Sequence, residues 1–233
     1  MTSVGRGSFG EATAVAVLGG VFGAAVGGPF GLAIPMGAVA AANGAISGWR
    51  RIYDWSCSNG LVAFTLDSTW AFPMTAAGLF SHGVAALSEK PSYDPGLGRR
   101  QNRHVYQRGF MPRRGFAITV GNVISGAGDT SLPRRQRLVT DHEDIHVWQA
   151  RWFGPLYPLL YGGWMLLGGA VGAVVWVVSR RSDRFTKVVE SCAYYVNPFE
   201  WWAYSRAGHW PPSGKVPGLG WRRPMVRPLR ATR

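Results

Sequence analysis

The stretch TDHEDIH at residues 140–146 decides how this 233-residue chain is interpreted. It contains the pattern H-E-x-x-H, with His142 and His146 four residues apart. On an α-helix this spacing puts both imidazoles on one face, where they can share a metal ion, and Glu143 can act as a general base on a water there. With five His and five Glu in the chain, chance predicts the pattern only about 0.002 times. The sequence therefore predicts a zinc-binding helix here.

The same residues have a structural interpretation that does not involve metal. Thr140 and Glu143 are spaced as the N-cap and N3 residues of a capping box, so Glu143 could instead close the start of the helix. His142 and His146 could also be packing residues, because Val147 and other residues nearby are apolar. Both interpretations stay open at this level.

A catalytic zinc ion usually takes three protein ligands and leaves one position for water. The best candidate for the third ligand is Glu200, in the stretch NPFE. That stretch also has a capping interpretation, with Asn197 as N-cap, Pro198 at the first helical position and Glu200 at the third. Glu190 and His104 are the reserve candidates.

The composition indicates a membrane protein. Apolar residues make up 47% of the chain and charged residues 16%, with 32 Gly and 11 Trp, which is too apolar and glycine-rich for an ordinary soluble domain. The net charge of +13 would suit nucleic acid or an anionic membrane surface. Basic residues gather beside the apolar stretches, as the positive-inside rule requires, and no basic helix or aromatic-basic module is evident. We therefore expect contact with anionic lipid headgroups and none with nucleic acid.

The first two parts of the chain are predicted to be membrane segments. Residues 1–50 form one or more glycine-rich apolar segments, and a break at Gly28-Pro29 allows either a hairpin of two short helices or one broken helix. Small residues at this spacing let helices approach closely in lipid, which allows an oligomer. Residues 51–98 hold a second apolar segment, transmembrane or re-entrant, interrupted by Asp67 and His82.

The remainder is predicted to hold the metal region and a basic tail. In residues 99–209 we expect a β-hairpin formed by strands at 104–108 and 116–120, then the H-E-x-x-H helix, a transmembrane segment at 154–178 and the NPFE helix. The apolar run at 154–178 is long enough for a hydrocarbon core of ~30 Å. The Pro/Gly-rich tail at 210–233 has no acidic residue and is expected to be disordered or to lie on anionic headgroups.

The chain also resembles a known group of proteins. The resemblance is carried by HExxHVxQ at 142–149, GPLY at 154–157, NPFExxA at 197–203 and GNVI at 121–124. These match small, largely uncharacterised bacterial membrane-associated proteins, in which an H-E-x-x-H helix runs through a Gly-Pro-Leu-aromatic step into an apolar hairpin and ends at N-P-[FY]-E-x-x-A. The resemblance covers about residues 104–207, and the first half of the chain lies outside it.

The resemblance implies a zincin-like site in which His142, His146 and Glu200 bind Zn²⁺ and Glu143 is the base. The fold it implies is a mainly α membrane protein with a small β-hairpin, its H-E-x-x-H helix packed against transmembrane helices. Asp144 departs from the pattern, because zinc peptidases usually have an uncharged residue there. This weakens the case for peptidase activity but does not exclude zinc.

Two functions follow from these expectations. The first is a gluzincin-like metallopeptidase that acts on membrane-adjacent polypeptides, with Tyr157, Tyr194 or His104 as the oxyanion helper. The second is a non-catalytic membrane scaffold or complex subunit, in which the metal is structural or absent. Nine basic residues against one acidic residue between Arg99 and Arg137 place the metal site of a multi-pass protein on the cytoplasmic side.

Overall fold

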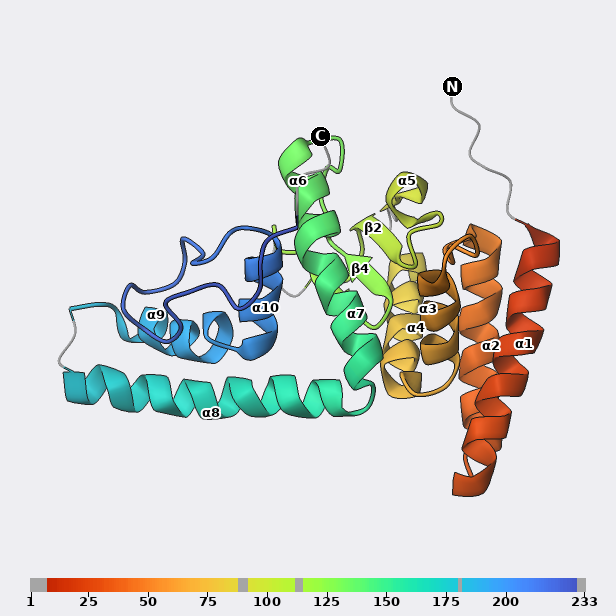
Figure 1. Cartoon of the computed structure of the whole chain (residues 1–233), viewed down its shortest axis with the longest axis horizontal. Helices are drawn as coiled ribbons and strands as arrows, with labels where there is room; N and C mark the ends of the chain where they lie inside the picture. The colour runs from red at the N-terminus through yellow and green to blue at the C-terminus, as the bar shows by residue number, and fades with distance from the viewer. Residues whose placement is uncertain (1–7, 88–91, 112–114, 180–181, 230–233) are drawn as a thin grey trace. The chain divides into compact units, whose positions relative to one another are not determined.

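A computed structural model shows a mainly helical chain with one small mixed sheet of four strands. The structure describes residues 8–87, 92–111, 115–179 and 182–229. The chain divides into two compact units, which we call unit 1 (Met1–Pro155) and unit 2 (Leu156–Arg233). Unit 1 contains the sheet and the H-E-x-x-H motif, whereas unit 2 contains the NPFE motif (Figure 1).

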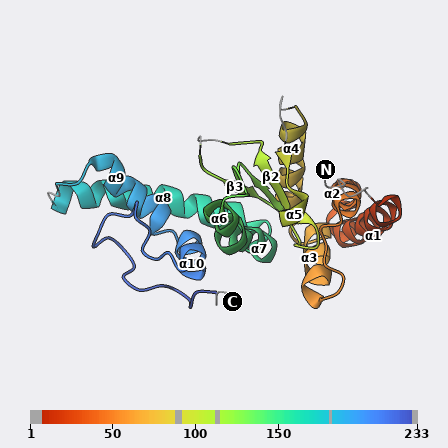
Figure 2. The ribbon, with the colours of Figure 1, turned by 90° about the horizontal axis from the view of Figure 1, so that it is seen from above.

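Unit 1 begins with a helical hairpin. Its parts are α1 (Phe9–Gly27), the turn η1 (Gly28–Phe30) and α2 (Ala33–Arg50). The Ser8 hydroxyl caps α1 by accepting the Glu11 N–H, as N-cap serines commonly do. The two helices lie side by side in both views (Figures 1 and 2), so the hairpin expected from the Gly28-Pro29 break is confirmed over the broken single helix.

Glycines let the two helices of the hairpin touch through their backbones. A Cβ added at Gly44 would lie 2.5 Å from the Val15 carbonyl oxygen, and one at Gly23 would lie 2.6 Å from that of Met36. Neither position tolerates a larger side chain without movement of the opposite helix. These glycines therefore serve the contact between α1 and α2 of one chain. An oligomer formed through glycine-rich helices stays a prediction.

The second apolar segment is two helices instead of one. They are α3 (Ser58–Ser68) and α4 (Phe72–Leu87), separated by a turn in which the Ala71 N–H bonds the Leu66 carbonyl. At 1.5 Å per residue α4 is about 24 Å long and α3 is shorter still, whereas a hydrocarbon core is ~30 Å thick. The expectation of a transmembrane or re-entrant segment in 51–98 stays a prediction, now for two short helices.

A small sheet follows the helices of unit 1. The strands are β1 (Ser92–Tyr93), β2 (His104–Arg108), β3 (Ile118–Val120) and β4 (Val123–Ser125), and the short helix α5 (Pro95–Gly98) lies between β1 and β2. Their order is β1-β2-β4-β3. The β1–β2 and β3–β4 pairs are antiparallel, and β2 runs parallel to β4.

The predicted hairpin between 104–108 and 116–120 is therefore wrong. The hairpin in the structure joins β3 to β4 through Gly121-Asn122, and Gly121 has a φ of +59°, which glycine adopts without steric cost. This two-residue turn, a known hairpin signal, prevents β3 from turning back along β2. Residues 112–114 of the predicted turn at 111–115 lie outside the described residues.

The helix that carries the H-E-x-x-H motif, which we call the metal helix for its predicted role, has three parts. It begins as α6 (Pro133–Arg137), continues through the π-helical turn η2 (Leu138–Glu143) and ends as α7 (Asp144–Phe153). Thr140 is thus inside the helix, and its hydroxyl donates to Asp141 instead of capping. The capping-box interpretation is wrong for this reason. In unit 1 the helix contacts the sheet and α3, and its predicted packing against transmembrane helices stays a prediction.

Unit 2 begins with a long apolar helix and ends in an ordered tail. Its helices are α8 (Leu156–Ser179), α9 (Phe185–Glu190), the π-helical η3 (Ser191–Tyr195) and α10 (Pro198–Arg206). Val216 and Leu219 of the tail are buried in one cluster with Val188 and Cys192.

The tail was expected to be disordered or to lie on lipid headgroups. Its described part is ordered, and its contact with headgroups stays a prediction. Trp221 stacks on Trp201 with 4.5 Å between ring centroids, and its indole N–H bonds the Val196 carbonyl. The apolar and aromatic residues of the tail provide enough buried surface to order it.

Two helices among the described residues are long and apolar enough to cross a membrane. They are Phe9–Phe30 and Leu156–Ser179, judged by length and composition alone. Only 17% and 11% of their most apolar windows are buried, so most of each is not used to form a protein core.

The close contact in the hairpin gives a test of the fold. We predict that Gly44→Ala lowers the free energy of unfolding by roughly 1–3 kcal/mol, because its methyl group would press on the Val15 carbonyl. Gly10→Ala in the same hairpin is the control, because nothing lies within 4 Å of a Cβ there. Denaturant unfolding in detergent checks both variants, and equal stabilities would contradict the backbone contact.

Candidate metal site

The H-E-x-x-H motif lies where the π-helical turn η2 passes into α7. Val139 and Val147 of this helix are buried in one cluster with Val105 and Ile124 of the sheet, which fixes the helix against β2 and β4. Single π-helical turns within α-helices are frequent at functional sites. The helix that carries the motif is thus held rigidly from both sides of the motif.

The two histidines meet through the nitrogens that a metal would use. The Nε2 atoms of His142 and His146 lie 3.3 Å apart, and the rings are edge to face with 4.9 Å between centroids. Both side chains are buried, at 5% and 6% exposure. The prediction that the pair shares one face of a helix is therefore confirmed.

Gln149 determines which nitrogen of His146 is available. Its Oε1 lies 2.8 Å from His146 Nδ1. Because an amide oxygen can only accept, this contact needs a proton on Nδ1, and in a singly protonated ring the lone pair is then on Nε2. Metal-binding histidines generally have such a partner on the second nitrogen.

Glu143 is held at the same site by the sheet. It is 5% exposed, and its Oε2 accepts a hydrogen bond of 2.7 Å from the Thr119 hydroxyl on β3. Its carboxylate therefore has a fixed orientation, with β3 against the metal helix.

Asp144 does not add a second carboxylate to the site. It forms an ion pair with Arg103, which also donates from Nε to the Leu97 carbonyl. Asp144 is not among the three residues that could hold a metal ion. The departure from the usual motif has a structural reason, because a buried arginine needs a counter-charge.

Glu200 is positioned by the start of α10 and by a tyrosine. The Asn197 side chain caps α10 by accepting the Phe199 N–H at 3.1 Å, so the predicted N-cap is confirmed. The Asn197 N–H bonds the Tyr194 carbonyl, and Glu200 Oε1 accepts from the Tyr161 hydroxyl at 2.7 Å. Glu200 is 2% exposed, and its carboxylate is bonded to Tyr161, so it does more than close the start of α10.

The three predicted ligands form one cluster. One ligand atom from each of His142, His146 and Glu200 lies within 4.8 Å of the other two, and all three side chains are buried. A buried group of two imidazoles and one carboxylate could bind a metal ion.

The reserve ligands lie elsewhere. Glu190 is exposed at the end of α9. His104 is fully buried, with Nε2 3.1 Å from the Ser47 hydroxyl and Nδ1 3.5 Å from that of Tyr93. Burial, with the nearby His82 and arginines, holds the pKa of His104 well below its usual value, so the ring stays neutral.

The three candidate oxyanion helpers have different surroundings. His104 is engaged with Ser47 and Tyr93, as described. Tyr157 is buried with its ring edge to face with Phe199, at 5.1 Å between centroids, and Tyr194 contacts the ring of Tyr195. Nothing in these contacts assigns the role to either tyrosine.

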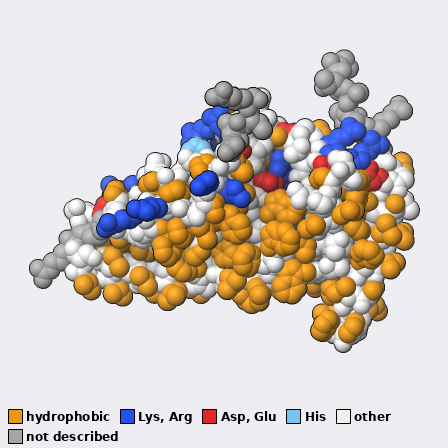
Figure 3. All heavy atoms as spheres, in the orientation of Figure 1, with side chains coloured by type: hydrophobic (Ala, Val, Ile, Leu, Met, Phe, Trp, Pro, Cys, Tyr) orange, Lys and Arg blue, Asp and Glu red, His pale blue; other side chains and the backbone are white. Residues whose placement is uncertain are grey.

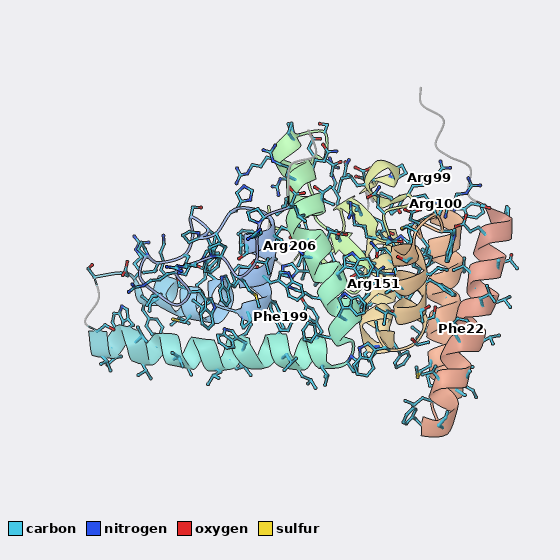
Figure 4. All side chains as sticks on the ribbon, viewed as in Figure 1. Phe22, Arg99, Arg100, Arg151, Phe199 and Arg206 are labelled. Atoms are coloured by element: carbon cyan, nitrogen blue, oxygen red, sulfur yellow. The ribbon has the colours of Figure 1, made fainter. Side chains whose placement is uncertain are left out.

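A buried ion pair anchors the metal helix within unit 1. Arg151 extends from α7 (Figure 4), and its Nε and one terminal nitrogen bind the two carboxylate oxygens of Asp67 at 2.8 and 2.9 Å. Burial alone would lower the pKa of Arg151, but the Asp67 charge more than offsets this and raises it. Asp67 also accepts from Tyr53 at 3.0 Å and Asn122 at 3.2 Å.

The sequence analysis assigned no supporting role to four residues that hold the site. Gln149 lies three residues after His146, so helical spacing could have identified it. Arg151 lies on the same helix, but its partner Asp67 is 84 residues away. Thr119 and Tyr161 reach Glu143 and Glu200 through tertiary structure, and no local signal marks them.

Comparisons with known proteins found no match: no protein-family model, no curated protein and no solved structure is similar to this chain. The resemblance to bacterial membrane-associated H-E-x-x-H proteins therefore stays a prediction.

The ion pair gives a test of the anchor. We predict that Arg151→Met lowers the free energy of unfolding by about 3–5 kcal/mol, because Asp67 would be left buried and unpaired. The double variant Asp67→Asn/Arg151→Met should lose less than the sum of the two single variants. Denaturant unfolding in detergent measures all of them. Arg99→Met, at an exposed arginine, is the control, and a loss for Arg151→Met no larger than for this variant would refute the anchor.

Proposed function

We propose that this chain is a membrane-associated zinc protein, and that its site hydrolyses peptide bonds near the membrane surface as a gluzincin-like metallopeptidase does. The observation that carries the proposal is the buried cluster of His142, His146 and Glu200, with its two Nε2 atoms 3.3 Å apart. Two nitrogens bound to one tetrahedral zinc ion at ~2.0–2.1 Å are separated by ~3.3–3.4 Å. The histidine pair thus has the spacing that zinc requires.

The donor set also favours zinc. Two imidazoles and one carboxylate are the ligands of one common class of catalytic zinc site, which keeps a position for water. When bound, the ion supplies Lewis acidity, which polarises a carbonyl group and makes water more acidic. Sulfur ligands, which would favour a purely structural site, are not part of the cluster.

The chain's own residues supply the remaining chemistry. Glu143 takes the proton of the attacking water and passes it to the leaving amine. Thr119 orients the Glu143 carboxylate, and the Gln149 contact leaves Nε2 of His146 available to hold a metal ion. Asp144 is neutralised by Arg103, so it adds no charge that would compete with Glu143.

The distribution of side chains in unit 1 supports a membrane location. Polar residues are buried on the helices, whereas large apolar residues are exposed on the hairpin. The buried polar residues are Asn43, Ser47, Asp67, Ser68, Thr75, Ser81 and His82. The exposed apolar residues are Phe9, Val17, Leu18, Val21, Phe22, Val26, Phe30, Leu32 and Ile34. A surface of this kind fits lipid and not water.

In unit 2, α8 supports the same location. Leu159, Leu166 and Val178 are more than two-thirds exposed on a helix that carries no charged residue. We propose that α8 lies in the membrane with the hairpin, and that the basic residues around both contact anionic headgroups from the cytoplasmic side. The substrate would then be a polypeptide segment next to the membrane.

A second function has one observation in its favour. His142, Glu143, His146 and Glu200 are all at most 6% exposed, and the Glu143 carboxylate is bonded to Thr119. A closed site of this kind also suits a structural metal that locks a membrane scaffold or a complex subunit. Glu143 separates the two functions, because hydrolysis needs it and a structural metal needs only its ligands.

Metal content by elemental mass spectrometry tests the proposal. We predict about one zinc per chain for the detergent-purified wild type and for Glu143→Gln, and loss of zinc in His146→Ala and Glu200→Ala. Glu190→Ala is the control for Glu200→Ala, since Glu190 is exposed and outside the cluster. Proteolysis of membrane-adjacent polypeptides should be lost in Glu143→Gln although its zinc is kept.

Two outcomes would count against the proposal in different ways. If the wild type holds no metal after zinc is supplied, the site is not a zinc site. If Glu143→Gln holds zinc and changes nothing that the wild type does, the scaffold function replaces the peptidase.

A further inference from the structure

The open end of the α1–α2 hairpin is polar and carries charges and tryptophans. Glu11 accepts from both terminal nitrogens of Arg100, at 2.6 and 2.8 Å, and from the Trp55 indole at 2.8 Å, and Arg51 lies 3.8 Å away. Trp49 near the end of α2 is 42% exposed. Figures 3 and 4 show this end of the hairpin with its charged side chains, including the labelled Arg100. Arginines and tryptophans together are typical of a membrane–water interface.

The closed end of the hairpin is entirely apolar. Phe30 is 74% and Ile34 85% exposed at this tip, and no charged residue lies between positions 12 and 48. Hydrophobic side chains cover the hairpin from its middle, where Phe22 lies, to the tip (Figures 3 and 4). Such a tip is unfavourable in water, and it lacks the polar residues that a loop in the opposite headgroup region would have.

Several backbone N–H groups of the tip are bonded within the hairpin. The Gly31 N–H bonds the Gly28 carbonyl at 3.0 Å, and the Leu32 N–H bonds that of Gly27 at 2.9 Å. The Gly28 N–H bonds the Ala24 carbonyl, and Pro29 has no N–H to satisfy. In hydrocarbon each unpaired backbone group costs several kcal/mol. These bonds reduce the cost of placing the turn in lipid.

Phe9–Phe30 is long and apolar enough to cross a membrane by length and composition alone, but its reach is shorter when the Glu11 cluster stays at one interface. From Ala12, next to the Glu11 cluster, to the end of α1 at Gly27 the helix is about 24 Å long at 1.5 Å per residue. The hydrocarbon core is ~30 Å thick. If the charged end stays at one interface, the tip ends inside the hydrocarbon.

We propose that the α1–α2 hairpin is a re-entrant anchor, which enters and leaves the lipid bilayer on one side and leaves its tip in the hydrocarbon core. The start of α1 and the rest of unit 1, including His142 and His146, are then on the same side of the membrane. The inference rests on the proposed membrane location but not on zinc or peptidase activity.

Cysteine labelling in membrane vesicles of known orientation tests this placement. Cys57 is free and exposed, and it reports on the charged end in the wild type. In a Cys57→Ser background, Gly10→Cys reports on the start of α1 and Gly28→Cys on the tip, because nothing lies within 4 Å of a Cβ at either glycine. Cys57→Ser alone gives the background from the buried Cys192.

With a membrane-impermeant maleimide, we expect Cys57 and Gly10→Cys to react from the same side. Gly28→Cys should react at least ~10-fold more slowly than Gly10→Cys from either side, because a thiol in lipid does not ionise, and should react fully after detergent solubilisation.

Three results would overturn the inference. Reaction of Gly28→Cys from the opposite side would mean that the hairpin crosses the membrane. If Gly28→Cys reacts from the same side and as fast as Gly10→Cys, the hairpin lies in water. If the protein still sediments with membranes in that case, another segment anchors it and the proposed membrane location holds. Labelling of Cys57 and Gly10→Cys from opposite sides would exclude a hairpin.

Discussion

The ion pair between Asp67 and Arg151 is the interaction on which unit 1 depends. Each charge is almost fully buried, and neither would be tolerated there without the other. Asn122 donates to both Asp67 and Asn43, and Asn43 in turn donates to Tyr53. This network ties α2, α3 and the β3–β4 turn to the helix that carries the histidines. The apolar part of unit 1 and the metal helix are therefore held as one body.

This arrangement explains how a helix rich in polar residues is kept beside helices with apolar surfaces. Many polar residues of α2, α3 and α4 are buried, whereas large apolar residues of the α1–α2 hairpin are exposed. The same placement suits a protein whose surroundings are lipid, because buried polar groups can then be satisfied only by each other. The metal histidines belong to this body, with Gln149 fixing His146 and Thr119 fixing Glu143.

Local signals predicted several parts of the structure correctly. The four-residue spacing of His142 and His146 was sufficient to place their rings together, and Gly28-Pro29 was sufficient to locate the turn of the hairpin. Asn197 caps its helix as its position before a proline indicates. In each case the outcome depends on residues within one or two helical turns.

Other features depend on partners that are distant in sequence. The Gly121-Asn122 turn pairs β3 with β4, so the strand at 104–108 pairs with β4 and not with β3. The predicted hairpin between the strands at 104–108 and 116–120 was therefore wrong. Likewise, the ion pair of Asp67 joins residues 84 positions apart. The tail at 210–229 is ordered by aromatic contacts to α10, which its Pro/Gly-rich composition concealed.

The most direct test of the central claim is X-ray absorption spectroscopy at the zinc edge, on the zinc-loaded wild type and on Glu200→Cys. The account predicts a wild-type first shell of nitrogen and oxygen at ~2.0–2.1 Å with imidazole scattering, and one sulfur at ~2.3 Å in Glu200→Cys. A wild-type spectrum without imidazole, or a Glu200→Cys spectrum without sulfur, would contradict a site built from His142, His146 and Glu200.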